Sequence, residues 1–110
     1  MRTHYLLGGL TIALVMGVLR SASADPGPMQ KWMRGNLASA VGQGDTTKVA
    51  NGLRYVAGKP VPGMDQWTAI ATKGAEAAEK GDLDGAKASC KACHGLYQKT
   101  YKETRRQEKW

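Results

Sequence analysis

The stretch Cys90–His94, which reads C-K-A-C-H, constrains this chain more than any other part of its sequence. On a helix, the two cysteines of such a C-x-x-C-H motif lie one turn apart on one face. Thiols at this spacing can each add to one vinyl group of a haem, which gives two thioether bonds. His94 follows directly, so its imidazole can bind the haem iron as the proximal ligand. The chain has only these two cysteines, Cys90 and Cys93, and no other histidine beyond position 4.

Two other uses of a C-x-x-C pair explain the sequence less well. A redox-active dithiol belongs next to a β-α-β pattern, and no strand pattern lies near Cys90. A closed structural zinc site needs four ligands, whereas Cys90, Cys93 and His94 supply three. Unpaired thiols also tend to oxidise in an exported chain. The sequence therefore predicts one covalently attached haem c.

The first 24 residues have the composition of a secretory signal peptide. Arg2 gives a positive start, residues 6–19 form an apolar run without a charge, and residues 22–24 fit the A-x-A cleavage pattern. The run of 14 residues is short for a membrane span, so we expect no stable membrane anchor after cleavage. Cleavage after Ala24 would leave residues 25–110 as one small domain, which we expect in the periplasm.

The predicted domain is small and basic. Its 86 residues can bury only a modest core, and a covalent haem would supply additional apolar area. Its 14 basic and 9 acidic side chains give a net charge of +5. This charge either favours encounter with an acidic redox partner or serves solubility alone. No motif that reads nucleic acid accompanies it, so we expect no nucleic-acid partner.

Apolar spacing divides the predicted domain into four helices. The first two cover residues 28–42 and 46–57, and Asp45 provides the cap of the second. After a loop rich in Gly and Pro, Asp65 caps a third helix that ends near Gly81. Asp82 caps the fourth helix, which covers residues 83–106 and carries the motif. Because the turns are short and no strand pattern exists, we expect an all-α fold, an antiparallel four-helix bundle that encloses one covalently attached haem.

The residue on the other face of the iron decides the function of such a haem. Only 16 residues follow His94 and none of them is methionine, so a methionine ligand must come from Met29, Met33 or Met64. Equal distances from the turns of an antiparallel bundle bring His94 level with residue 32, between Met29 and Met33. Met64 lies in the loop at the far end. Met29 and Met33 can instead fill core space, which would leave the distal face open.

The sequence resembles the class II c-type cytochromes, which comprise the cytochrome c prime group and its low-spin relatives. The resemblance is most specific over residues 81–94 and at the following Tyr97, and it covers essentially all of the predicted domain. It implies haem thioethers at Cys90 and Cys93, proximal ligation by His94, and a sixth ligand, when present, from a methionine on the first helix. We also expect Tyr97 to contact the haem. Relatives often dimerise, so a homodimer is a further expectation.

The chain departs from the family pattern near the position of the haem carboxylates. The arginine that the family usually carries one turn before the distal position is absent, because Asp25 precedes Met29 by four residues. Arg34 and Arg54 are the candidates to replace it. On the first helix we also expect Trp32 to contact the haem.

The favoured function is electron carriage by a low-spin haem with His94 and a methionine of the first helix as ligands. Basic residues near the haem would orient a negatively charged redox partner; they include Lys87, Lys91 and Lys99. The alternative is a five-coordinate haem that binds nitric oxide or carbon monoxide as a scavenger or sensor. Enzymatic turnover needs a distal acid or base, and the predicted domain has no second histidine, so we do not expect an enzyme.

Overall fold

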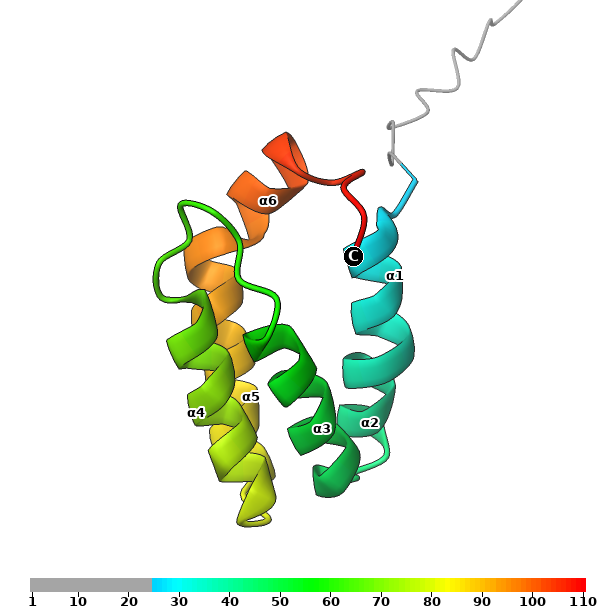
Figure 1. Ribbon diagram of the computed structural model, residues 1–110. Helices are drawn as coiled ribbons and strands as arrows, with labels where there is room; N and C mark the ends of the chain where they lie inside the picture. The colour runs from blue at the N-terminus through cyan, green and yellow to red at the C-terminus, as the bar shows by residue number, and fades with distance from the viewer. Residues whose placement is uncertain (1–24) are drawn as a thin grey trace, which may run out of the picture.

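The computed structural model describes residues 25–110, so the predicted signal peptide 1–24 lies outside the described residues. Residues 25–110 form helices and loops and contain no strand. The helical elements join into four continuous rods, residues 28–42, 46–57, 67–79 and 83–104. In Figure 1 each rod runs opposite to the one before it. The predicted all-α, antiparallel arrangement is therefore confirmed. Within this part of the chain, no helix is both long enough and apolar enough to cross a membrane.

The N-terminal helix covers residues 28–42, as predicted, but its middle is wider than an α-helix. It consists of α1 (Pro28–Trp32), η1 (Met33–Ala38) and α2 (Ser39–Gly42). Pro28 occupies the first turn, where its missing N–H costs no hydrogen bond. The segment η1 is a π-helix, in which backbone hydrogen bonds span five residues instead of four.

Two of the three predicted aspartate caps are present. The helix α3 (Thr46–Ala57) begins after Asp45, whose carboxylate accepts a hydrogen bond of 3.0 Å from the backbone N–H of Lys48. The helix α5 (Leu83–Cys93) begins after Asp82, which accepts a 2.9 Å bond from the N–H of Gly85. Each cap satisfies a backbone donor that has no partner within its helix.

The predicted cap at Asp65 is wrong. The helix α4 (Trp67–Glu79) begins two residues later, with Gln66 at the N-cap and no side-chain cap. The backbone supplies the partners here instead, because the N–H of Trp67 donates to the carbonyl of Met64 at 3.0 Å. The N–H of Gln66 donates to the hydroxyl of Tyr97 at 2.9 Å.

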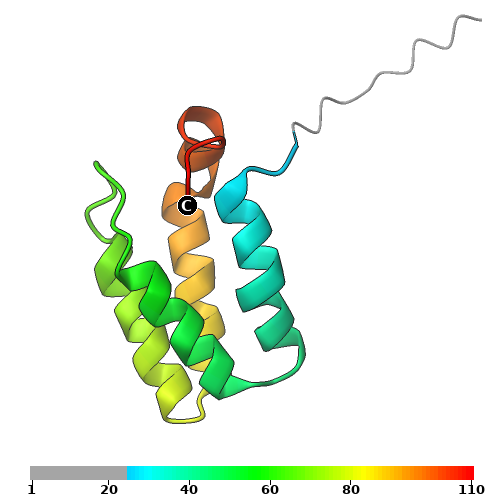
Figure 2. The ribbon, with the colours of Figure 1, turned by 45° about the vertical axis from the view of Figure 1, so that its right-hand side comes forward.

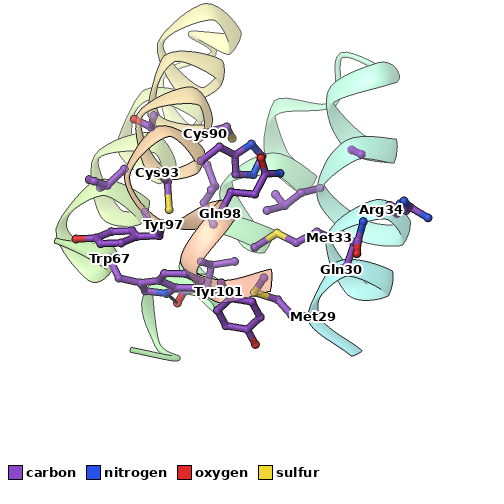
Figure 3. A pocket seen from close by; sticks show the side chains of 18 of the residues that line it. Met29, Gln30, Met33, Arg34, Trp67, Cys90, Cys93, Tyr97, Gln98 and Tyr101 are labelled. Carbon is purple, nitrogen blue, oxygen red and sulfur yellow. Dashed lines mark hydrogen bonds between the residues drawn. The ribbon is translucent and has the colours of Figure 1, made fainter. Parts of the chain in front are cut away.

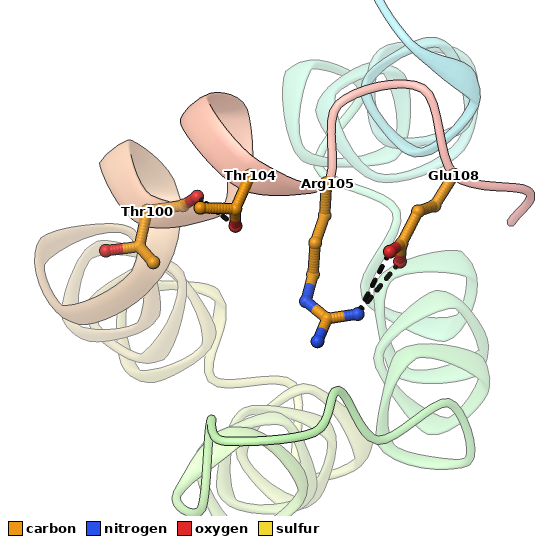
Figure 4. A network of polar contacts seen from close by, with 4 residues as sticks. All are labelled: Thr100, Thr104, Arg105 and Glu108. Atoms are coloured by element: carbon orange, nitrogen blue, oxygen red, sulfur yellow. Dashed lines mark hydrogen bonds and ion pairs between the residues drawn. The ribbon is translucent and has the colours of Figure 1, made fainter.

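The fourth predicted helix begins at Leu83 as expected, but a π-helical segment interrupts its α-helical geometry and it ends early, at Thr104. We call residues 83–104 the last rod. After α5 come a second π-helix, η2 (His94–Gln98), and α6 (Lys99–Thr104). The helix stops before residue 106 because the backbone of Arg105 leaves the helical region, with φ at −135°. Beyond it the chain turns, and Arg105 Nη1 lies 3.1 Å from the carboxylate of Glu108 (Figure 4).

The rods do not pack equally closely. The pairs α3–α4 and α4–α5 lie in close contact, and the N-terminal helix packs on α3 but makes few close contacts with α5 (Figures 1 and 2). At Gly74 of α4, an added Cβ would lie 2.9 Å from the Cβ of Ser89 and 3.0 Å from Cδ1 of Leu53. The absence of a side chain thus lets three helices meet. The core consists mainly of small and aliphatic residues: Val49, Ala50, Leu53, Val56, Ala71, Ala75, Ala78 and Ala86.

Candidate cofactor site

A cavity of about 370 Å³ lies between the N-terminal helix and the last rod (Figure 3). Its volume is in the range of pockets that bind small molecules and cofactors. Most of its lining is apolar, and the side chains come from four rods. The apolar lining residues include Met29, Met33, Leu37, Val41, Leu53, Val56, Trp67, Ile70 and Ala71.

All three chemically informative residues of the C-x-x-C-H motif line this cavity. Cys90 and Cys93 are half-buried on the last turns of α5, and His94 begins the π-helix that follows. Tyr97, one turn further, lines the same wall, and Figure 3 shows it beside Cys93. The structure thus brings together Cys90 and Cys93, predicted to attach the haem, His94, the predicted proximal ligand, and Tyr97, the predicted aromatic contact.

The thiols of the motif differ from those of a dithiol oxidoreductase. Burial raises the pKa of Cys90, and burial together with the neighbouring Cys90 raises the pKa of Cys93. Reactive dithiols instead have a lowered pKa, which exposes a thiolate near neutral pH. Within residues 25–110, no three or more His, Cys, Asp or Glu side chains gather into a group that could hold a metal ion. Neither the dithiol nor the zinc explanation gains support from this geometry.

The segment after the motif is tied to the start of α4. The hydroxyl of Tyr97 accepts the hydrogen bond from the N–H of Gln66, and its ring lies 6.3 Å from the ring of Trp67, measured between centroids. The indole Nε1 of Trp67 in turn donates to the carbonyl of Val56 at 3.0 Å. These contacts fix the wall that carries His94 relative to α3 and α4.

The opposite wall carries the two candidate methionines. Met29 and Met33 are half-buried and line the cavity. In Figure 3 the side chain of Met33 points across the cavity at the level of Gln98, whereas Met29 lies beside Tyr101. Met64 is buried in the core and does not line the cavity. The structure therefore places the methionines predicted from the antiparallel register opposite the motif.

Trp32 does not reach this cavity. Its ring stacks on Tyr55 with 4.8 Å between centroids and lies 5.7 Å from the ring of Trp110. Because it precedes Met33 by one residue, it projects from another face of the helix. Trp67 is the tryptophan that lines the cavity. Apolar spacing predicts that both Trp32 and Trp67 face the interior. The packing of the helices shows that only Trp67 lines the cavity.

The charged side chains in the cavity wall are all basic: Arg34, Lys87, Lys102 and Arg106. Of the two candidates to replace the arginine of the family, Arg54 does not line the cavity, and its guanidinium pairs with the carboxylate of Glu79, at 2.8 Å from Nε and 3.1 Å from Nη2. Arg34 does lie in the wall, and Arg106 is an addition that sequence reasoning missed. An apolar interior with a cationic border fits a flat apolar group that carries carboxylates, such as haem.

Comparisons of the chain with protein-family models, with curated proteins and with solved structures found no match.

Proposed function

We propose that this chain is an exported monohaem c-type cytochrome that carries single electrons. The observation that carries the proposal is that Cys90, Cys93, His94 and Met33 all line one cavity. Two thiols and an imidazole on one wall, with a thioether on the other, make a complete set for covalent attachment and axial ligation of a haem. When bound, the haem would supply a one-electron iron couple.

The attachment chemistry uses the two thiols and consumes no other residue. Each thiol, of Cys90 and of Cys93, would add across one vinyl group, with the sulfur bonding to one vinyl carbon and hydrogen to the other. Both cysteines are free and both thiols line the cavity, which supports this role. His94, the next residue, would bind the iron on the same side.

Met33 is the better candidate for the sixth ligand. Its side chain points across the cavity at the level of Gln98, four residues after His94, whereas Met29 lies beside Tyr101 (Figure 3). A methionine sulfur opposite a histidine raises the reduction potential relative to a second histidine. The hydrogen bonds from Gln66 to Tyr97 and from Trp67 to Val56 would hold the wall that carries His94 in place, so this ligand would move little between oxidation states.

The surface around the motif suits a negatively charged redox partner. Lys87, Lys91 and Lys99 are exposed on the last rod, close in sequence to His94. Basic side chains around an electron-transfer site raise the rate of encounter with an acidic partner. The predicted signal peptide supports the periplasm as the compartment.

The visible spectrum of the ferrous protein, before and after addition of carbon monoxide, tests the proposal. A six-coordinate, low-spin spectrum that carbon monoxide leaves unchanged is the expected result. A high-spin spectrum that shifts promptly with carbon monoxide would overturn electron carriage and favour a module that binds nitric oxide or carbon monoxide.

A further inference from the structure

We propose that Arg106 binds a haem carboxylate, so that the segment after the last helix completes the cofactor site. This inference rests on the proposed haem function and adds a residue to it. Arg106 lines the cavity, and its Nε is buried without a hydrogen-bond partner among residues 25–110. A buried donor of a charged group is costly to leave unpaired, so an acceptor in the cavity is the expected partner.

The backbone around Arg106 is fixed by both ends of the described chain. Its carbonyl packs directly against Gly27, where an added Cβ would collide with it. The side-chain amide of Gln107 lies 3.4 Å from the carbonyl of Asp25. Arg106 is therefore held in place by the turn that follows α6, which reduces the entropy lost when its side chain binds an anion.

The chemistry of haem directs the carboxylates away from the motif. The two vinyl groups and the two propionates lie at opposite edges of the porphyrin, so attachment at Cys90 and Cys93 leaves the carboxylates at the far edge. Arg106 is 12 residues beyond His94, at the end of the cavity wall formed by the last rod. Guanidinium groups match the planar, two-oxygen geometry of carboxylates.

The other cationic lining residues fit this role less well. Arg34 and Lys87 are exposed, so water can satisfy their donors. Lys102 is half-buried on α6, but a buried side-chain donor without a partner occurs only at Arg106 and Trp110 within the described residues. Trp110 does not line the cavity and carries no charge. The combination of positive charge, cavity lining and an unpaired buried donor is specific to Arg106.

The test compares Arg106→Gln with Arg105→Gln in the haem-loaded protein. Arg105 is the neighbouring arginine, but it pairs with Glu108 and does not line the cavity. A guanidinium beside a carboxylate lowers the carboxylate pKa by about 1–3 units. Removing Arg106 should therefore raise the propionate pKa by that amount. The pH range over which the midpoint potential of the haem changes should then move to higher pH. Arg105→Gln should titrate as the unchanged protein does.

A second measurement needs no variant. In the nuclear magnetic resonance spectrum of the reduced holoprotein, an Overhauser contact should join Hε of Arg106 to a propionate methylene. The inference is overturned if this contact is absent, if Arg106→Gln titrates as the unchanged protein does, or if Arg105→Gln produces an equal shift. Failure of the haem function itself gives a different result, because the purified protein would then carry no haem at all.

Discussion

Met33 and His94 are the first residues of the two π-helical segments, and both line the same cavity from opposite walls. A π-helical turn is rare, and such turns occur frequently at functional sites because they redirect the side chains that follow. Here one such turn begins at each proposed axial ligand. The backbone of both walls is thus locally altered at the two positions that would face the iron.

Replacement of Met33 by alanine should open the sixth coordination site. Without this sulfur, the ferrous spectrum should become high-spin and should shift on addition of carbon monoxide. Met29→Ala is the matched control, because it removes the same side chain one helical turn away and should leave a low-spin spectrum. The reverse pattern would assign the ligand to Met29, and low-spin spectra from both variants would exclude methionine ligation by this helix.

Replacement of both Cys90 and Cys93 by alanine should leave a largely unfolded apoprotein. Helices of this length are marginal in isolation, and the cavity separates the N-terminal helix from the last rod. A far-ultraviolet circular dichroism spectrum should therefore lose most of the helical signal of the holoprotein. Native-like helicity in the double variant would contradict this expectation.

The replacement Gly74→Ala should lower the free energy of unfolding by about 1–3 kcal/mol. The added methyl would lie within 3.0 Å of both Ser89 and Leu53, so α3, α4 or α5 must shift. Gly42→Ala is the control, because nothing lies within 4 Å of an added Cβ there. This second variant should be neutral or more stable by up to about 1 kcal/mol, since alanine favours a helix over glycine. Urea unfolding of the holoprotein measures both, and equal effects would contradict the packing described at Gly74.

The pair Arg54–Glu79 should make a small contribution to stability that disappears in acid. The hydrogen bond from the Arg54 guanidinium lowers the pKa of Glu79 below its ordinary value of 4.5. A carboxylate whose pKa is lower in the folded than in the unfolded state stabilises the folded protein at pH values above its unfolded-state pKa. This stabilisation is lost as the pH falls through its folded-state pKa. The effect is small because both side chains are about half exposed.

The variant Glu79→Gln should therefore unfold at a lower urea concentration than the unchanged protein at pH 7. The urea midpoints of the two proteins should converge as the pH falls below 4.5. Glu103→Gln, which removes an exposed carboxylate with no ion pair within residues 25–110, is the control. A midpoint difference for Glu79→Gln that persisted in acid would show that the loss comes from another cause than the charge.

Most of the fold could be predicted from local sequence signals. The first two helices occupy the predicted ranges 28–42 and 46–57, and Asp45 and Asp82 cap helices as expected. The error at Asp65 arose because the backbone turn from Met64 to Trp67 starts the helix without a side-chain cap. The two π-helical segments were not predicted, because apolar spacing does not distinguish a π-helical turn from an α-helical one.

The candidate site could be predicted in part. Spacing placed Cys90, Cys93 and His94 on one wall, and the antiparallel register placed the methionines opposite them. Trp32, predicted to contact the haem, does not line the cavity and packs on Tyr55 instead, because adjacent helical positions point to different neighbours, which apolar spacing does not distinguish. Arg106 could not be found, because its position depends on the turn after α6 and its packing against Gly27.

The proposed function requires covalent attachment of one haem through Cys90 and Cys93, and intact mass spectrometry detects this attachment. The full chain is expressed in a bacterium that matures c-type cytochromes, and the purified protein is extracted with acidic acetone to remove any haem that is not covalently bound. We expect the polypeptide to retain the mass of one haem, and the single variants Cys90→Ala and Cys93→Ala to retain at most one thioether each. A polypeptide mass without haem after extraction would exclude a c-type cytochrome.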